Sequence, residues 1–348
     1  MSVSRMRDLA RRVLPPCVYD RVSMYVIGPI RQLRERRLRR RLSSSAMAAL
    51  VTRMARTGEG TDECLKQGSL PLPVHFYSPV PNLDDLEQRG VWARRSELAG
   101  IAFSSESQVA YLRTLGRQYG GECAWPASST GEGRVFFTEN GYFSFGCAAA
   151  AHCIVRERKP RRVLEIGSGN SSLVLSAALE RNTQEGTPAA EYTVVDPYPS
   201  PLLQGGQRLP TEVVAKRVEV LEPRFFDCLE RNDVLFIDSG HTVRIGGDVN
   251  FLILDVLPRL RPGVLVHFHD IGLPYEYPKV YAADARYRML WTEAYLLQAF
   301  LACNDSYDVL LALAYLMSDR TPDFRAAFPS YDPARHVAVS GSFWIARR

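Results

Sequence analysis

The sequence lacks the features that mark several classes of protein. The apolar run Val309 to Met317 is flanked by Asp308 and Asp319 and stays well below the roughly 18 to 20 residues that a membrane-spanning helix needs. The seven cysteines contain no C-x-x-C pair and are odd in number, which argues against a disulfide scaffold, a zinc site and a redox dithiol. No collagen repeat, sustained heptad pattern or low-complexity tract is present. We therefore expect a globular protein in a reducing compartment.

The first residues also lack an apolar core of the length that a secretory signal requires, because charges are scattered through residues 1–16. We therefore expect a cytoplasmic protein.

Charge is unevenly distributed along the chain. The net charge is +5, but residues 1–50 alone carry 12 Arg against 3 acidic residues, so the remainder is slightly acidic. The basic residues concentrate between Arg34 and Arg41, a run that could face anionic lipid or nucleic acid. The alternative is a solvated helical arm, favoured because the apolar residues between Ile30 and Leu42 lack the spacing of a membrane-lying helix. Peripheral membrane contact stays open, and a nucleic-acid partner is the less favoured interpretation.

Changes in composition and apolar pattern along the chain predict three parts. Residues 1–90 form a basic arm followed by an irregular connector rich in Gly, Pro and Ser. Residues 91–159 form a helical lead-in or lid, with helices expected over 105–119 and 145–158. Residues 160–348 form the domain that carries the chemistry.

Strands and helices alternate in this third part. Short apolar runs predict strands at residues 162–166, 192–195, 218–221, 234–237, 264–268, 309–315 and 342–346. A helix with one apolar face is expected around Leu173 to Ala178, and further helices at 249–260 and about 287–303, the first of these two with apolar residues at i, i+3, i+4, i+7 and i+8. Nearly continuous apolar strands alternating with helices indicate a doubly wound α/β sheet, mostly parallel and covered on both faces. Ligands of such sheets bind at the carboxyl ends of the strands.

The first of these strand ends carries a glycine turn. Val163-Leu-Glu-Ile-Gly-Ser-Gly169 runs from a strand into a helix, and Gly167 and Gly169 would allow a ligand to approach the backbone. Glu165 lies within the strand, and Asp196 ends the next strand, where a ribose diol would meet a carboxylate. Ser172 replaces the third glycine of a dinucleotide fingerprint, which argues against a pyrophosphate.

These motifs resemble those of the class I S-adenosylmethionine-dependent methyltransferases, a Rossmann-like fold whose last strand is antiparallel. The resemblance covers about the last 190 residues and rests on Glu165 to Gly169, Val194 to Asp196 and Asp233 to Asp238. It implies S-adenosylmethionine as the cofactor. The residues implied to bind it are Glu165, Gly167, Ser168, Gly169, Asn170 and Asp196, with Glu222 near the adenine.

A second group of polar residues follows the fourth and fifth strands. Asp238-Ser-Gly-His241 and His267-Phe-His269-Asp270 would meet at one crevice if those strands are neighbours. The arrangement is similar to that of small-molecule O-methyltransferases, in which aspartates after these two strands hold a divalent ion. We therefore predict His241 as general base, with Asp238 and Asp270 as further catalytic groups.

The same group predicts a site for Mg²⁺ or another divalent cation with Asp238, His269 and Asp270 as ligands. The alternative is that Asp270 caps a loop and His269 is a hydrogen-bonded core histidine. His267 is expected in the core.

The predicted acceptor is a small molecule or a saccharide, methylated on oxygen. Methylation of a base amine typically uses an Asp/Asn-Pro-Pro-aromatic turn after the fourth strand, and the sequence there is Asp238-Ser-Gly-His241. Methylation of a base carbon needs a cysteine nucleophile, often in a Pro-Cys pair, and the Pro-Cys pair of this sequence, Pro16-Cys17, lies far away in the basic arm. A nucleic-acid methyltransferase that uses the arginine run, and a non-catalytic module with this fold, stay open as alternatives.

Two loops are candidates for the walls of the acceptor site. The aromatic residues of Leu273 to Lys279 could stack on a ring, or the loop could be a proline-pinned surface loop. Asn140 to Phe145 could form a lid over the cofactor.

Overall fold

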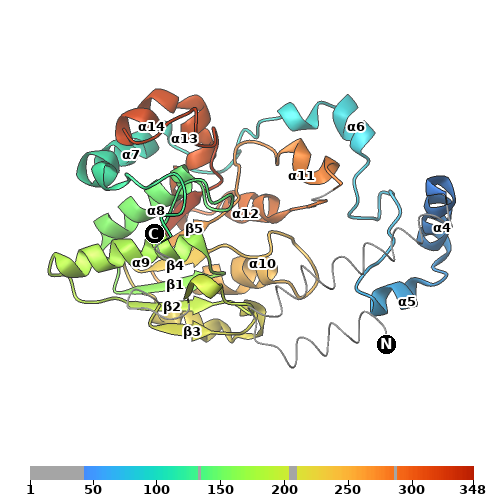
Figure 1. Ribbon diagram of the computed structural model, residues 1–348, viewed down its shortest axis with the longest axis horizontal. Helices are drawn as coiled ribbons and strands as arrows, with labels where there is room; N and C mark the ends of the chain where they lie inside the picture. Colours follow the sequence, from blue (N-terminus) through green and yellow to red (C-terminus); the bar gives the residue numbers. More distant parts are fainter. Residues whose placement is uncertain (1–42, 132–134, 204–209, 286–287) are drawn as a thin grey trace. The chain divides into compact units, whose positions relative to one another are not determined.

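The computed structural model describes residues 43–131, 135–203, 210–285 and 288–348. The chain divides into two compact units, Met1–Asn82 and Leu83–Arg348 (Figure 1). The arginine run Arg34 to Arg41 lies outside the described residues, so its predicted contacts stay predictions. Over the residues that the structure describes, no helix combines the length and apolarity needed to span a bilayer.

The described part of the first unit consists of two helices and an extended connector. Helix α4, Ser44–Thr57, begins at Ser43, whose Oγ accepts a hydrogen bond from the amide of Ala46 at 3.2 Å. It ends at Gly58, which adopts a left-handed conformation with φ of +75°. Helix α5, Thr61–Lys66, lies within the segment predicted to be irregular.

The second unit is built on a seven-stranded sheet in the order β3-β2-β1-β4-β5-β7-β6. Figure 1 labels the first five strands of this order. All neighbouring strands are parallel except that β7 is antiparallel to both β5 and β6, which confirms the predicted topology. Every residue of the central strands β4 and β5 is buried, so both faces of the sheet are covered. The strands are β1 Arg162–Ile166, β2 Glu191–Val195, β3 Glu212–Val214, β4 Val234–Ile237, β5 Leu265–Phe268, β6 Tyr307–Ala312 and β7 Phe343–Arg347.

Two strand predictions need correction. The third strand is β3, which pairs with β2, whereas the predicted segment begins with the 3₁₀ turn Val218–Val220. The apolar pattern misleads here because β3 is a short, largely exposed edge strand with little apolar signal. The segment that begins at Val218 has the apolar residues expected of a buried strand, and Val218 is indeed buried, but in a 3₁₀ turn. The sixth strand ends at Ala312, and its predicted last residues begin helix α13, Leu313–Asp319, since a short apolar run does not distinguish strand from helix.

The lead-in helices agree with the prediction. They are α7, Ser105–Tyr119, and α8, Phe145–Arg158, and α8 is buried along almost its whole length. Helix α7 packs against α8, β6 and α14, Thr321–Ala327, so this segment belongs to the same compact unit as the sheet. The remaining helices of the unit are α6 Leu83–Gln88, α9 Asn170–Gln184, α11 Lys279–Ala283 and α12 Glu293–Leu301, together with short 3₁₀ turns at 91–93, 120–122, 201–203 and 223–228.

The predicted helix at 249–260, which has the clearest apolar period, is helical in the structure but irregular. It begins as α10, Asp248–Asn250, continues as the π-turn Phe251–Val256, and ends in the 3₁₀ turn Leu257–Arg259. Pro258 has no amide hydrogen to donate to the preceding turn, which accounts for the change of hydrogen bonding at this end.

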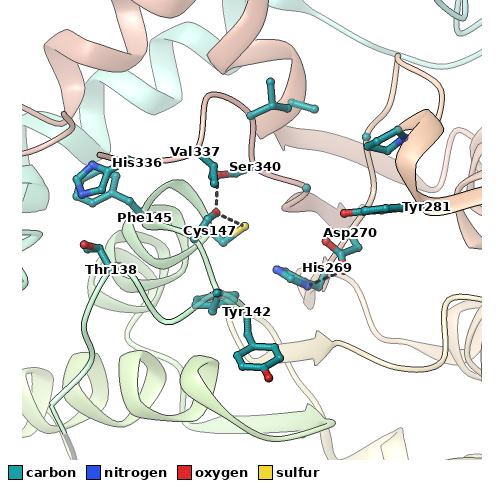
Figure 2. Close-up of a pocket in the computed structure, with 18 of the residues that line it drawn as sticks. Thr138, Tyr142, Phe145, Cys147, His269, Asp270, Tyr281, His336, Val337 and Ser340 are labelled. Carbon is teal, nitrogen blue, oxygen red and sulfur yellow. Dashed lines mark hydrogen bonds and ion pairs between the residues drawn. The ribbon is translucent and has the colours of Figure 1, made fainter. Parts of the chain in front are cut away.

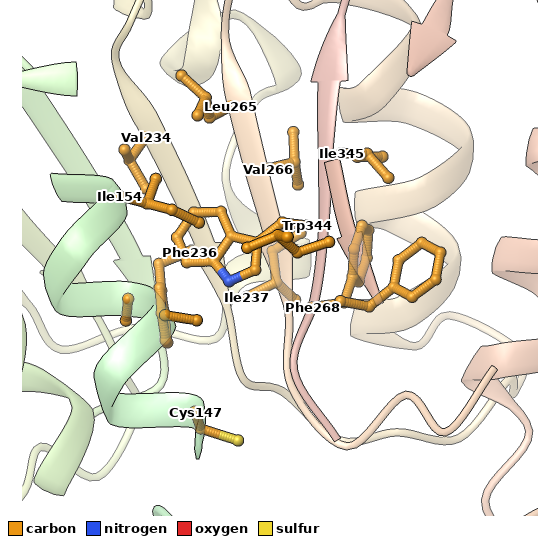
Figure 3. Packing of buried hydrophobic residues seen from close by; sticks show 14 of the residues in the cluster. Cys147, Ile154, Val234, Phe236, Ile237, Leu265, Val266, Phe268, Trp344 and Ile345 are labelled. Atoms are coloured by element: carbon orange, nitrogen blue, oxygen red, sulfur yellow. The ribbon is translucent and has the colours of Figure 1, made fainter. Parts of the chain in front are cut away.

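The core of the sheet surrounds Trp344 on β7 (Figure 3). The indole lies 6.0 Å from the ring of Phe236 on β4 and 4.8 Å from His267 on β5, measured between ring centroids. His267 is fully buried and bonds through Nε2 to Ser342 Oγ at 2.6 Å, which confirms its prediction as a core residue.

Candidate active site

The glycine turn after β1 brings two strand ends together. Gly167 has φ of +88°, and a Cβ on it would lie 2.1 Å from the backbone oxygen of Asp238. A larger residue would therefore push apart the ends of β1 and β4. A Cβ on Gly169 would meet nothing within 4 Å, so the backbone here borders open space. Asn170 begins α9 directly after the turn.

Glu165 lies beneath this turn and does not face open space. Its side chain is fully buried and accepts hydrogen bonds from Ser171 Oγ at 2.6 Å and Ser172 Oγ at 2.7 Å, and a further one from the hydroxyl of Tyr192. Burial raises its pKa to about 7 against the opposing effect of these hydroxyls. The carboxylate therefore ties β1, β2 and the first turn of α9 together.

Asp196 and Ser168 form the next part of the crevice. Ser168 Oγ donates to Asp196 Oδ2 at 2.6 Å and accepts from the amide of Ser200 at 2.9 Å, and the amide of Tyr198 donates to Asp196 Oδ1 at 2.7 Å. Each oxygen of Asp196 keeps a further lone pair. The carboxylate is held in place and can still accept from a diol.

Glu222 does not occupy the predicted place. It follows the 3₁₀ turn Val218–Val220 rather than β3, its side chain is 66% exposed, and it pairs with Arg224 at 2.6 Å. Its candidacy depended on the misplaced third strand.

The polar residues after β4 and β5 converge. Ile237 pairs with Phe268 in the sheet, so the segments that follow start side by side. His241 Nε2 lies 3.4 Å from Asp238 Oδ1 and 3.7 Å from Asp270 Oδ2. His269 Nδ1 lies 3.5 Å from the same two oxygens. Both carboxylates thus lie between two imidazole rings.

Glu293 completes this cluster and has no counterpart in the sequence prediction. Its Oε2 lies 2.7 Å from His241 Nδ1, and its side chain is almost fully buried at the start of α12. An acidic residue at the start of a mostly apolar helix is a signal in the sequence for a special role. Nothing in the local sequence, however, pairs it with a histidine 52 positions away.

The cluster is strongly coupled electrostatically. Burial lowers the pKa of His241, but hydrogen bonds and charge from Asp238 and Glu293 outweigh it and raise the pKa to about 10. Burial likewise opposes the effect of Asp238 on His269, whose pKa is nevertheless raised. The two histidines hold the pKa of Asp238 far below its usual range, also against burial.

The arrangement does not fit the predicted divalent cation. Among the described residues, no group of three or more His, Cys, Asp or Glu side chains is placed to hold a metal ion. Asp238 and Asp270 direct their oxygens at His241 and His269, and a protonated imidazole has no lone pair to offer a metal. We therefore derive no step through a cation at Asp238, His269 and Asp270.

A cavity of about 460 Å³ opens beside the cluster. Figure 2 shows His269 and Asp270 on one side and Phe145 and His336 across from them, with the Tyr281 hydroxyl directed inward. His241 is not among the residues that line the cavity, nor are the glycine turn and Asp196. Asp270 thus has the cavity on one side and His241 on the other.

The two candidate loops supply cavity walls. Tyr275, Glu276 and Tyr277 line it from the first loop, and residues between Thr138 and Phe145 line it from the second. Asn140 shapes that second loop, because its Nδ2 donates to the carbonyl oxygens of Phe137 at 2.7 Å and Phe143 at 2.9 Å. Lys279 lies away from the chemistry in an ion pair with Glu87 at 2.6 Å.

Strand order, the antiparallel seventh strand and the polar strand ends together define a methyltransferase-type α/β domain. The family model for a methyltransferase domain matches residues 164–271, which include the glycine turn and both carboxylates of the cluster. An uncharacterized protein of Archaeoglobus fulgidus is 30% identical over 182 residues, which span 50% of this chain and 80% of that relative.

Two solved structures have lower sequence identity to the chain. One is a "putative protein-L-isoaspartate O-methyltransferase" from Plasmodium falciparum in complex with S-adenosyl-L-homocysteine, at 10% identity, covering 54% of this chain and 81% of that one, with a TM-score of 0.24. The other is a "putative methyltransferase" from Thermobifida fusca, at 12% identity, covering 72% and 96%, with a TM-score of 0.33. The family match and the sheet topology carry the assignment: the chain belongs to the class I S-adenosylmethionine-dependent methyltransferases.

Proposed function

We propose that the chain methylates a hydroxyl group of a small molecule or saccharide, and that His241 receives the hydroxyl proton. The observation that carries this proposal is the convergence of Asp270, His241 and Glu293 beside the cavity, where a buried carboxylate orients an imidazole. A neutral alcohol is a poor nucleophile until its proton is removed.

The glycine turn and Asp196 are the groups that hold the cofactor. S-adenosylmethionine supplies an electrophilic methyl group on sulfonium. The backbone from Gly167 to Asn170 would line its amino-acid end, and Asp196 has lone pairs for two ribose hydroxyls. Glu165 acts by holding the turn in shape, because its carboxylate is enclosed by three hydroxyl donors.

The acceptor hydroxyl would bind to Asp270, which lines the cavity. Asp270 Oδ2 lies 3.7 Å from His241 Nε2, and closing this gap to hydrogen-bond distance in the complex would let the proton pass from the hydroxyl through Asp270 to that nitrogen. In the neutral ring, which forms at high pH, Glu293 accepts from Nδ1 and thereby leaves Nε2 as the proton acceptor. Asp238 stabilises the imidazolium that forms.

Two measurements on the full chain test the proposal. Calorimetry with S-adenosyl-L-homocysteine should detect binding that Asp196→Ala weakens, and no binding to folded protein would contradict cofactor assignment at this turn. Once an acceptor that the enzyme methylates is known, His241→Ala and Asp270→Asn should each lower kcat by about 10²-fold or more. Unchanged turnover in both variants would overturn the proton path.

The cavity wall offers one competing proton acceptor. His269 lines the cavity, whereas His241 does not. A loss of turnover in His269→Ala together with wild-type turnover in His241→Ala would transfer the role to His269.

A further inference from the structure

The cavity walls combine aromatic rings with carboxylates. The aromatic rings that line the cavity are those of Tyr142, Phe143, Phe145, Tyr275, Tyr277 and Tyr281, together with the imidazoles of His269 and His336. Its volume of about 460 Å³ lies within the range of ordinary small-molecule sites. Such rings present electron-rich faces that attract cations as well as apolar surface.

The charged residues of the lining have an excess of negative charge. Arg335 pairs with Glu139 at 3.5 Å, so these two largely cancel. Asp270 also lines the cavity, but the imidazoles of His241 and His269 lie beside it. Glu276 lines the cavity as well and pairs with no lysine, arginine or histidine in the described part of the chain. A ligand that enters here meets the carboxylate charge of Glu276, which no cationic side chain of the described wall neutralises.

Glu276 is held with one oxygen free. The hydrogen bonds that it accepts, from the amide of Tyr277 at 2.9 Å and from the hydroxyl of Tyr295, both reach Oε1. No described residue donates to Oε2. The side chain is therefore fixed in direction by its own neighbours while one carboxylate oxygen stays available to a ligand.

Two tyrosine rings of the cavity wall are linked through Trp291 to the proton acceptor. Tyr277 lies 6.1 Å from Trp291 and Tyr281 lies 4.8 Å from it, both edge to face. Trp291 also lies 4.5 Å from His241. These contacts fix the tyrosine walls relative to the reacting end of the cavity.

We propose that the acceptor carries a protonated amine, as an amino sugar does, and that Glu276 and the tyrosine rings of the segment Leu273 to Tyr281 bind that ammonium. This inference rests on the proposed function, since it names the acceptor of the same site. An ammonium gains an ion pair with Glu276 Oε2 and cation–π contact with the rings, and a neutral hydroxyl at the same position gains neither.

D-glucosamine and D-glucose provide matched probes, because they differ only in the amine that replaces one hydroxyl. Saturation-transfer NMR titrations on the full chain with S-adenosyl-L-homocysteine present should show glucosamine binding about tenfold more tightly than glucose. Glu276→Gln, which keeps an oxygen for the Tyr295 hydroxyl, should reduce this preference to about twofold or less. Tyr281→Leu should reduce it partly.

Glu63→Gln is the matched control, because it removes an exposed carboxylate that does not line the cavity and should leave the preference unchanged. Equal affinity for both sugars, no binding of either, or an unchanged preference in Glu276→Gln would each overturn the inference. Binding of S-adenosyl-L-homocysteine in the same samples separates the two proposals: if it persists while the amine preference is absent, only the acceptor class fails.

Discussion

Nδ1 of His241 lies 2.7 Å from Oε2 of Glu293, and both side chains are buried. This contact joins the segment after β4 to the start of α12. Oε1 of Glu293 has no hydrogen-bond partner among the described residues, so the histidine is the principal partner of this acid. A buried carboxylate with a single imidazole partner determines which ring nitrogen carries the proton.

Removing the charge of Glu293 should therefore impair turnover more than binding. We expect Glu293→Gln to lower kcat by about 10²-fold, because the imidazole loses the carboxylate charge that orients it and stabilises the imidazolium. Affinity for S-adenosyl-L-homocysteine should stay unchanged, as should turnover in Glu191→Gln, which removes an exposed carboxylate paired with Arg162. Steady-state kinetics and calorimetry measure both. A fall in kcat that Glu293→Asp does not partly restore would point to a structural effect instead.

Turnover should rise with pH well beyond the usual histidine range. The pKa of His241 is raised to about 10 by Asp238 and Glu293, so in the free enzyme the ring is protonated at neutral pH and unable to accept a proton. A profile of kcat/KM against pH should climb toward pH 10, and in Glu293→Gln its midpoint should move to lower pH. A wild-type plateau reached near pH 6.5 would contradict the assignment.

The same shift predicts a pH dependence of stability. Because the folded-state pKa of His241 lies above its unfolded value of about 6.5, its contribution is fully present below that value. The contribution is lost as pH rises toward 10. Urea unfolding of His241→Gln and wild type should therefore differ more at pH 6 than at pH 10, and a constant difference would count against the shift.

Glu165 should prove to be a structural residue with an effect on the cofactor. Glu165→Ala leaves three buried hydroxyls without their acceptor, so we expect a loss of about 3 kcal/mol in the free energy of unfolding and weaker binding of S-adenosyl-L-homocysteine. Tyr192→Phe removes only one donor and should cost about 1 kcal/mol. Chemical denaturation measures both. Full stability with lost binding in Glu165→Ala would indicate direct contact with the cofactor.

Removal of divalent metal should leave the reaction rate unchanged. The carboxylates of Asp238 and Asp270 are directed at imidazoles rather than arranged around a cation. Dialysis against EDTA, with added Mg²⁺ as the comparison, should give equal turnover. Loss of activity that Mg²⁺ restores would return these residues to the role of metal ligands.

The sequence by itself determined most of the sheet and the edge of the sheet at which the polar candidate residues lie. Strands β1 and β4 and helices α7 and α8 have the predicted bounds, because each is a strongly patterned local segment. Asp196, Asp238 and Asp270 lie at strand ends as expected, since parallel strands place their carboxyl ends at one edge. Where the local pattern is weak, as at the exposed edge strand β3, the prediction is wrong.

Only the tertiary structure decided what each polar residue does. Glu165 lies within β1 and Asp196 directly follows the neighbouring strand β2, but packing encloses the first among hydroxyls and leaves the second with free lone pairs. Glu293 joins His241, and Glu276 reaches the cavity, through contacts between segments far apart in the chain. Local sequence sets backbone conformation and apolar pattern, whereas burial and charge pairing depend on which distant segments meet, and those determine protonation and binding.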